Sequence, residues 1–234
     1  MGIRKHIPNA LTCCNLLCGC LAIYLHNEAL VALLFVLLAA MFDFLDGLAA
    51  RSLKAYSPIG KDLDSLADMV SFGVLPAMML FVGTSHPYLR FVTLLLVAFS
   101  ALRLAKFNLD ERQHASFLGL PTPASAMICG SLVCYSFVSP DSWAAWLCNQ
   151  SWFIPALSLV ICYLLVCEIP MFSMKLSTGK KASARTNVLR IPFFVLVAAS
   201  AIYSIVAGEH VSLVFLVAFT GYVLLNLINS FLPE

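Results

Sequence analysis

Four aspartates stand close together in an otherwise apolar part of the chain. Asp43 and Asp46 are three positions apart, and Asp64 and Asp68 are four positions apart. On a helix, either spacing puts both members of a pair on one face. Carboxylates that converge in a small volume repel one another and need cations, and an all-oxygen site suits Mg²⁺, Mn²⁺ or Ca²⁺ better than zinc. The four residues therefore predict a divalent-metal site shared by two helices.

The residues between the acids favour a phosphate ligand beside that metal. Gly47 and Ala50 follow Asp46 and leave space next to its carboxylate. Arg51 carries a guanidinium, which binds phosphate oxygens with two parallel hydrogen bonds. Gly60 opens the next predicted helix, whose N-terminus favours an anion.

The composition indicates a membrane protein. The 234 residues are 61% hydrophobic and 11% charged, whereas a soluble domain is about half apolar and about a quarter charged. A net charge of +2 gives no reason to expect a nucleic-acid partner. The nine cysteines lack zinc-ligand spacing and are interpreted as packing residues. The lipid bilayer is therefore the expected surrounding of this chain.

Eight apolar segments of roughly twenty residues predict eight transmembrane helices. We expect one membrane domain over residues 1–234, with a polar turn at 108–120 and a basic loop at 172–189. Residues 1–8 are expected to form a short interfacial segment or only a basic flank. The catalytic core with the spans that follow it covers 9–208, and the last span covers 211–231. The predicted spans are 9–26, 29–50, 62–83, 88–107, 121–139, 151–171, 190–208 and 211–231.

The positive charges orient these spans. All of the 14 Lys and Arg residues except Arg90 fall on the side of the N-terminus. Because cytoplasmic loops carry the excess of Lys and Arg, this side is predicted to be cytoplasmic. We therefore expect a multi-pass protein of the cytoplasmic (inner) cell membrane, with its acidic site facing the cytoplasm.

Residues 43–68, DFLDGLAARSLKAYSPIGKDLDSLAD, resemble the signature D-x2-D-G-x2-A-R-x8-G-x3-D-x3-D of the CDP-alcohol phosphotransferase family at every fixed position. The resemblance implies an all-α integral membrane fold that contains a six-helix core and forms a homodimer. It also implies a divalent cofactor, Mg²⁺ or Mn²⁺, at two ion positions. The implied metal ligands are Asp43, Asp46, Asp64 and Asp68.

The same resemblance implies roles for the other signature residues. Gly47 and Ala50 would flank the nucleotide of a CDP-lipid such as CDP-diacylglycerol. Arg51 would contact phosphate, and Gly60 would allow close approach of the nucleotide. Asp68 would also be the general base toward the acceptor hydroxyl. Asp62 lies outside the signature and is interpreted as a solvated residue.

Three further stretches, 8–22, 64–77 and 103–125, resemble bacterial phosphatidylserine synthases. That resemblance implies L-serine as acceptor, with phosphatidylserine and CMP as products. Arg103 and Asn108 are the candidates for binding the serine molecule.

Several of these residues keep a second interpretation. Ser71 is expected to line the acceptor pocket or to pack between helices. Asn15 is expected to contact the CDP-lipid or to form a hydrogen bond between helices. Arg103 could belong to the acceptor site or be a positive flank of its span.

Two other functions remain open at this point. A sister enzyme would use glycerol 3-phosphate or an inositol phosphate as acceptor. A divalent-cation transporter would use the acids as an ion path, although it would leave Gly47, Ala50, Arg51 and Gly60 without a purpose. An intramembrane aspartyl protease is disfavoured because no GxGD stretch occurs.

Overall fold

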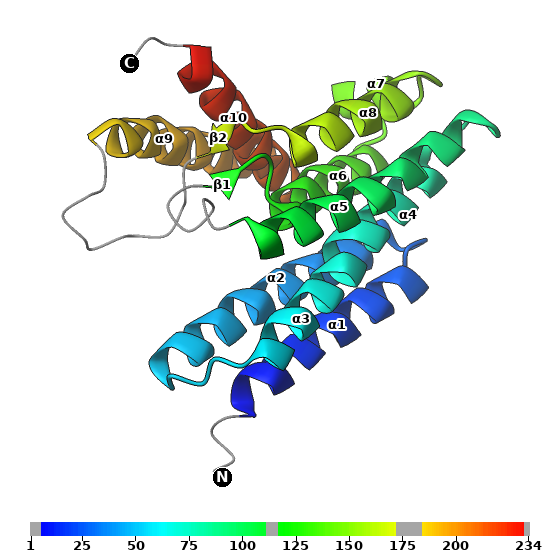
Figure 1. Cartoon of the computed structure of the whole chain (residues 1–234). Coiled ribbons are helices and arrows are strands. Elements are labelled where there is room, and N and C mark those ends of the chain that lie inside the picture. Colours follow the sequence, from blue (N-terminus) through cyan, green and yellow to red (C-terminus); the bar gives the residue numbers. More distant parts are fainter. Residues whose placement is uncertain (1–5, 111–116, 172–183, 232–234) are drawn as a thin grey trace.

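Helices make up nearly all of the computed structural model, which describes residues 6–110, 117–171 and 184–231 (Figure 1). The first helix, α1, spans Ile7–Tyr24, and α2 spans Ala29–Ser52. A long helix follows, in which α3 (Pro58–Asp68) continues through the π-helical turn η2 (Met69–Val74) into α4 (Leu75–Gly83). The remaining helices are η3 (Leu89–Leu94, a 3₁₀ helix), α5 (Leu95–Leu109), α6 (Thr122–Val138), α7 (Trp143–Cys148), α8 (Phe153–Val166), α9 (Ala184–Ala207) and α10 (Ser212–Phe231).

The predicted all-helical membrane fold is confirmed. Within the described residues, five helical segments are long and apolar enough to cross a membrane. Three shorter apolar helices, at 122–138, 153–166 and 191–207, match the other predicted spans. The long segments are Ile7–Tyr24, Ala29–Ser52, Pro58–Gly83, Leu89–Leu109 and Ser212–Ser230.

Several boundaries differ from the prediction for local reasons. The third span begins at Pro58 rather than at residue 62, because Ser57 caps the helix and its Oγ accepts from Gly60 N at 3.0 Å. Proline suits the first helical position, where no N–H bond is lost. Helix α9 begins at Ala184, inside the stretch predicted to be a loop. Of the expected interfacial segment, residues 1–5 lie outside the described part, and α1 already begins at Ile7.

A short antiparallel ladder joins two loops and was not predicted. Strand β1 (Phe117–Leu118) pairs with β2 (Pro170–Met171), so α8 ends at Val166 instead of reaching residue 171. Next to the ladder, Gly119 has a φ of 75° and donates its N–H to Ile169 O at 2.9 Å. A side chain there would meet backbone carbonyls, one of them about 2.7 Å away. Glycine is therefore needed at this turn.

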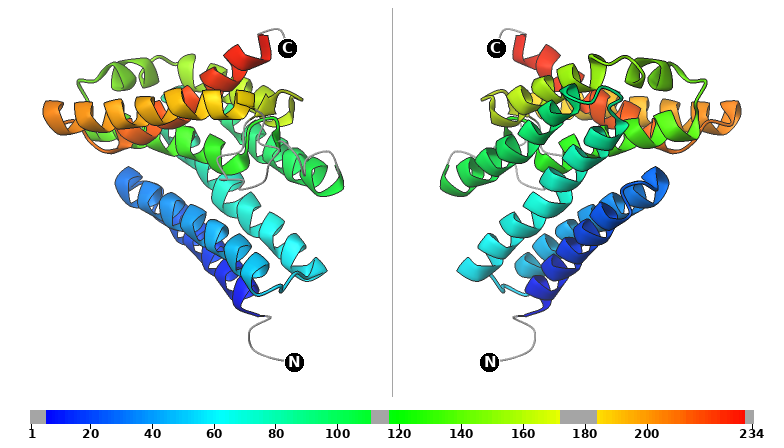
Figure 2. Two further views of the ribbon diagram at one scale, coloured as in Figure 1. Left: turned by 90° about the vertical axis from the view of Figure 1, so that its left-hand side faces the viewer. Right: turned by 90° about the vertical axis from the view of Figure 1, so that its right-hand side faces the viewer.

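The helices form two groups joined by the long helix. Figure 2 shows α1, α2 and α3 side by side at one end of the molecule and the C-terminal helices at the other, with α3–α4 running from one group into the other. Helix α6 lies at the centre: it packs against α2, α4 and α10, and nearly all of its residues from Thr122 to Tyr135 are buried. The aspartates of the signature thus sit in the first group, where it meets the second.

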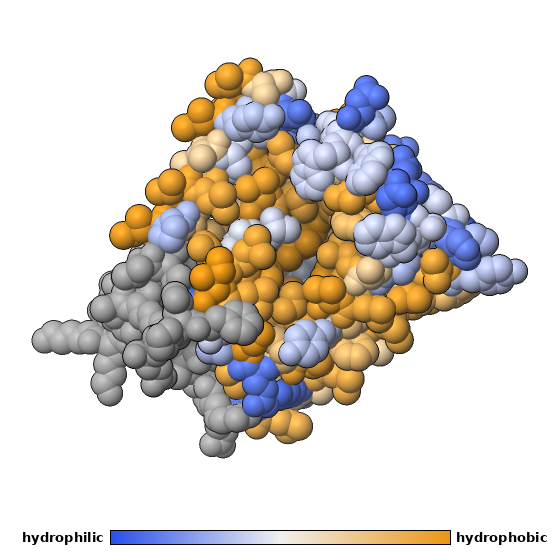
Figure 3. All heavy atoms as spheres, turned by 90° about the horizontal axis from the view of Figure 1, so that it is seen from above, coloured by the Kyte–Doolittle hydropathy of each residue, from blue (hydrophilic) through white to orange (hydrophobic). Residues whose placement is uncertain are grey.

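The outer surface is largely apolar. Leu34 on α2 and Ile202 and Val206 on α9 are examples of large apolar side chains on the surface, and Val206 is 82% exposed. Apolar side chains also cover most of the face shown in Figure 3. Contiguous exposed apolar surface of this extent is unfavourable in water but suits hydrocarbon. The chain is a multi-pass membrane protein.

Candidate active site

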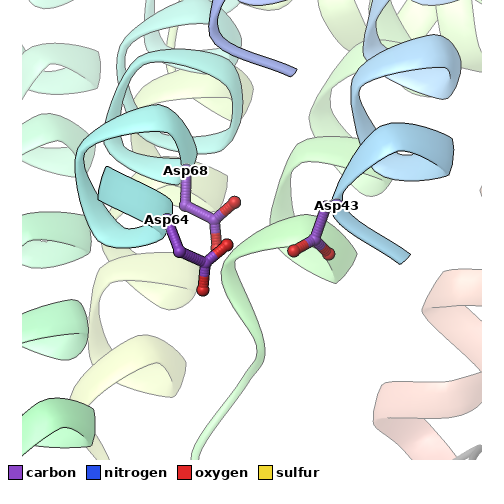
Figure 4. A group of neighbouring side chains, drawn as sticks. All are labelled: Asp43, Asp64 and Asp68. Carbon is purple, nitrogen blue, oxygen red and sulfur yellow. The ribbon is translucent and has the colours of Figure 1, made fainter. Parts of the chain in front are cut away.

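Three aspartates from two helices converge. One carboxylate oxygen from each of Asp43, Asp64 and Asp68 lies within 4.8 Å of the others. Figure 4 shows Asp43 reaching from α2 toward Asp64 and Asp68 on α3. Asp68 is 8% exposed, and the other two are half-buried. Both helices pack against α1, and in this arrangement the acidic faces of α2 and α3 meet, as the sequence predicted.

Asp46 stands beside this group rather than in it. It is buried, and its Oδ2 accepts a 2.6 Å hydrogen bond from Thr12 Oγ1 on α1. Three residues are less than a full helical turn, so Asp46 is rotated away from Asp43 toward α1. The sequence predicted that four carboxylates converge. In the structure three of them converge, and the fourth, that of Asp46, is bonded to the hydroxyl of Thr12.

The donor set fits a divalent cation. Carboxylate oxygens are hard ligands, and Mg²⁺ and Mn²⁺ prefer them to sulfur or imidazole. A buried carboxylate among other carboxylates is costly without such a cation. Asp43, Asp64 and Asp68 could hold the ion directly, and Asp46, three residues along α2 from Asp43 and bonded to Thr12, is the candidate for a second position.

Asn15 and Ser71 fix the position of Asp68. Asn15 is fully buried, and its Nδ2 donates to Asp68 Oδ1 at 3.2 Å. Ser71 is also fully buried and donates to Asn15 O at 3.0 Å. The predicted hydrogen bond of Asn15 between helices is therefore present. Among the described residues Asn15 Oδ1 has no hydrogen-bond partner, so this amide keeps an acceptor for a bound ligand. Ser71 packs between α1 and η2.

The last turns of α2 carry a cationic side chain, that of Arg51, next to a position without a side chain, Gly47. Arg51 is exposed in the last turn of α2. A Cβ placed on Gly47 would lie 3.7 Å from Arg51 Nη1, so the guanidinium lies over the glycine. Ala50 is half-buried in the same turn. The three residues leave room for a flat or anionic group beside the acids.

Gly60 lies where α1 approaches the start of α3. A Cβ on Gly60 would lie 3.0 Å from both Asn9 Oδ1 and Ser57 Oγ. A side chain there would therefore force a neighbour to move. The amide of Asn9 thus lies beside the capped N-terminus of α3, a position where an anion is favoured.

The candidates for acceptor binding lie on α5 in different surroundings. Arg103 is 5% exposed, donates from Nε to Leu120 O at 2.7 Å, and has its Cζ 5.4 Å from the centre of the Phe107 ring. The charge of Arg103 also interacts with that of Asp68. A fully buried guanidinium is not a solvated flank, so the first interpretation of Arg103 is favoured.

Asn108, near the end of α5, contacts α3 away from the acidic group. Its Nδ2 donates to Ser65 Oγ at 2.7 Å, and its backbone oxygen accepts from Lys61 Nζ at 2.7 Å. It lines a groove of about 340 Å³ between α3 and α5, together with Asp62 and Leu66. The acidic group does not line this groove. Asp62 is exposed as expected, but it faces the groove as well as solvent.

Thr12 is a site residue whose function the sequence reasoning did not identify. The signal was available, because Pro8, Thr12, Asn15 and Gly19 form a buried stripe of small or polar residues on an otherwise apolar helix. A stripe of that kind indicates a helix face that contacts a polar partner. Here the partners are the carboxylates of Asp46 and Asp68.

Known proteins are similar in sequence to much of this chain. The family model described as CDP-alcohol phosphatidyltransferase matches residues 5–161. Three relatives carry the name CDP-diacylglycerol–serine O-phosphatidyltransferase. The protein from Bacillus subtilis is 38% identical over 128 residues, which cover 53% of this chain and 72% of the relative. The protein from Mycobacterium tuberculosis is 35% identical over 185 residues (74% and 63%). The protein from Methanocaldococcus jannaschii is 36% identical over 129 residues (54% and 61%).

The alignments thus span less than two thirds of the last two relatives. The family match, in contrast, covers more than half of this chain and includes α1 to α3 with all the signature aspartates. The chain therefore belongs to the CDP-alcohol phosphatidyltransferase family.

Proposed function

We propose that this protein transfers the phosphatidyl group of CDP-diacylglycerol to the hydroxyl of L-serine, giving phosphatidylserine and CMP. The observation that carries the proposal is the convergence of Asp43, Asp64 and Asp68 within the region matched by the family. The choice of serine is supported by the relatives, whose names all specify it.

The proposed roles follow from the positions of the side chains. Asp43, Asp64 and Asp68 hold a divalent ion, Mg²⁺ or Mn²⁺, and Asp46 serves a second ion. Bound there, such ions neutralise the pyrophosphate and the departing CMP. Arg51 binds a phosphate oxygen.

The reaction itself is a substitution at phosphorus. The serine oxygen bonds to the β-phosphorus, and the bond from that phosphorus to the bridging oxygen breaks. CMP leaves with the electron pair, and Asp68 takes the proton of the hydroxyl. The hydrogen bond from Asn15 keeps one carboxylate oxygen of Asp68 fixed, so the other can face the acceptor.

The cell location and the assembly are also part of the proposal. The charge asymmetry supports a cytoplasmic membrane with the site facing the cytoplasm. That side is where a water-soluble acceptor and the CDP head group would be available. Homodimer formation rests on the family resemblance, and light scattering of the detergent-solubilised protein tests it.

An acceptor assay tests the function directly. The purified protein in lipid vesicles receives CDP-diacylglycerol, Mn²⁺ and one acceptor at a time: L-serine, glycerol 3-phosphate or an inositol phosphate. We expect CMP release and phosphatidylserine with L-serine alone, and no turnover after a chelator removes the metal. CMP release with glycerol 3-phosphate but not with L-serine would make the protein a sister enzyme.

A further inference from the structure

The buried amide of Asn15 is hydrogen-bonded on one side only. Its Nδ2 donates to Asp68 Oδ1 at 3.2 Å, whereas its Oδ1 has no partner among the described residues, although Asn15 is fully buried. The orientation of the amide is fixed, because the NH2 group and not the oxygen must face a carboxylate. A buried acceptor that stays unpaired destabilises a fold. The missing partner of Oδ1 is therefore a hydrogen-bond donor that binds beside Asp68.

The position of Asn15 along α1 separates it from the expected place of the nucleotide. Asn9, near the start of α1, lies beside Gly60 at the start of α3, whereas Asn15 reaches Asp68 at the end of α3. Gly60 and Asp68 are eight residues apart on this helix, which is about 12 Å along its axis. The family resemblance puts the nucleotide beside Gly60. Its base and ribose are therefore remote from Asn15.

Among the groups that would meet at Asp68, the ammonium of the acceptor suits Asn15 Oδ1. The pyrophosphate of the CDP-lipid offers oxygens that accept hydrogen bonds and do not donate them. The serine hydroxyl has one proton, which goes to Asp68 in the proposed reaction. The serine ammonium has three N–H donors, and its carbon is bonded to the one that bears the hydroxyl. A hydroxyl at Asp68 therefore brings the ammonium within reach of the amide that already holds Asp68.

We propose that Asn15 is a specificity-determining residue, whose Oδ1 accepts a hydrogen bond from the ammonium of the acceptor while its Nδ2 holds the base, Asp68. Because Asn15 Oδ1 is covered, the ammonium reaches it from the side of Asp68, which is 8% exposed. A hydrogen bond from a charged donor is stronger than one between neutral groups, and an alcohol without an ammonium leaves the buried oxygen unpaired. The acceptor, L-serine, is taken from the proposed function, so this inference rests on it.

Asn15→Leu tests the role with two analogues that carry no hydroxyl. L-alanine has the ammonium and the carboxylate of serine, and propionate has the carboxylate alone. The rise in melting temperature that each produces in the solubilised protein with CDP-diacylglycerol and Mn²⁺ gives its affinity without any turnover. In the wild type we expect L-alanine to bind about tenfold more tightly than propionate, the value of one hydrogen bond to a charged group. In Asn15→Leu this advantage should vanish, while the affinity for propionate stays at its wild-type value.

A second variant and a control complete the test. Asn15→Asp keeps an oxygen where Oδ1 stands, so the advantage of L-alanine should persist, although kcat for L-serine should fall because a carboxylate lacks the N–H groups that hold Asp68. Asn226→Leu is the matched control. It removes another fully buried amide, on α10, whose Nδ2 donates to Tyr222 O at 2.7 Å, and L-alanine should keep its advantage there.

Three results would overturn the inference. The first is an advantage of L-alanine that survives in Asn15→Leu, which would assign the oxygen to water or to the CDP-lipid. The second is an equal loss of affinity for L-alanine and propionate, which is the behaviour of a packing residue. The third is loss of the advantage in Asn15→Asp. The proposed function fails in a different way: the wild type then releases CMP with glycerol 3-phosphate but not with L-serine, and L-alanine does not stabilise it.

Discussion

Asp68 receives a hydrogen bond from Asn15 and lies in a buried position among other acids. This environment holds the carboxylate in place before any substrate binds. A group that is fixed in advance loses little freedom during the reaction, and this favours proton transfer. The distinction between binding and proton transfer can be tested at this residue.

Asp68→Asn should lose turnover while still binding the CDP-lipid. The amide keeps the size of the side chain but cannot take a proton, and loss of a general base costs at least about 100-fold in rate. CMP release gives kcat, and a binding assay with radiolabelled CDP-diacylglycerol gives the affinity. Asp62→Asn is the control, because Asp62 faces the groove between α3 and α5, and it should retain wild-type turnover. A near-normal kcat of the Asp68→Asn variant would contradict the assignment of Asp68 as the general base.

Thr12→Val should weaken the response to metal. Valine keeps the shape of the side chain but removes the 2.6 Å hydrogen bond to Asp46. Loss of a group that orients a metal-binding carboxylate typically costs roughly 10- to 100-fold in metal affinity. Titration of activity with Mn²⁺ measures the change.

Thr84→Val provides the comparison for Thr12→Val. The hydroxyl of Thr84 bonds to Leu80 O at 2.7 Å, after the last turn of α4 and far along the helix from the acids. Its Mn²⁺ titration should match the wild type. If both variants have the same titration curve, Asp46 does not depend on Thr12.

At the scale of elements, the contact between α1 and the π-helical turn η2 positions the base. Gly19 on α1 faces Ser71 on η2 so closely that a Cβ would lie about 2.9 Å from Ser71 Cα. π-helical turns interrupt α-helices most often at functional sites, and this one begins directly after Asp68. The width of the turn and the absence of a side chain at Gly19 together set the distance between Asn15 and Asp68.

Gly19→Ala should therefore reduce both stability and activity. The added methyl group cannot fit without separating the helices, and overpacking of this kind costs about 1–3 kcal/mol. Thermal unfolding in detergent and CMP release measure the two effects. Gly83→Ala is the control: its nearest neighbours would be 3.6 Å from the new Cβ, so it should be tolerated. Equal behaviour of the two variants would show that the helix contact is not tight.

The two cations of α5 should respond differently to the same substitution. Arg103→Gln removes a buried guanidinium that donates to Leu120 O and interacts electrostatically with Asp68, so activity with L-serine should fall by more than tenfold, about the loss of a charged hydrogen bond. Lys106→Gln breaks an exposed ion pair with Glu168 at 2.9 Å, and such pairs contribute little, about 0–1 kcal/mol. CMP release and melting curves of the two variants give the comparison. If Lys106→Gln lost as much activity as Arg103→Gln, the position of the acceptor site would be wrong.

The sequence predicted the helices and the acids because apolar segments and charged residues are local features. The meeting of the acids of α2 and α3 followed from a short loop and two acidic faces, whereas the packing of both helices on α1 was not predicted. Contacts between distant segments were not predictable in this way. The ladder between Phe117–Leu118 and Pro170–Met171 involves only two residues on each side and has no sequence pattern. The rotation of Asp46 toward Thr12 depends on how α1 packs, and helical spacing alone does not determine it.

At the scale of the whole molecule, the acids lie at the same membrane side as the loop between α2 and α3. The lysines and arginines are concentrated on this side in the sequence, and Arg90 at the start of η3 is the exception. Access to the site from water should therefore depend on which face of the membrane is exposed.

Sealed membrane vesicles test this orientation. Vesicles with the cytoplasmic face outward should release CMP when L-serine and Mn²⁺ are added outside. Vesicles of the opposite orientation should do so only after a detergent has permeabilised them, because neither charged compound crosses the bilayer unaided. Activity only in sealed vesicles of the opposite orientation would place the site on the other face, and equal activity of both sealed preparations would place it in a channel open to both sides.

The division into two helix groups has a consequence for how such enzymes diversify. The first group, α1 to α3, carries every residue proposed to hold the metal and the CDP-lipid, whereas Arg103, the candidate for binding the acceptor, lies on α5 in the second group. The second group must preserve only its connection through α3–α4 and its packing against the first group. It can therefore accumulate substitutions without disturbing the residues that bind the nucleotide. One amino alcohol can therefore be exchanged for another as the acceptor by substitutions on α5 that leave the chemistry of transfer intact.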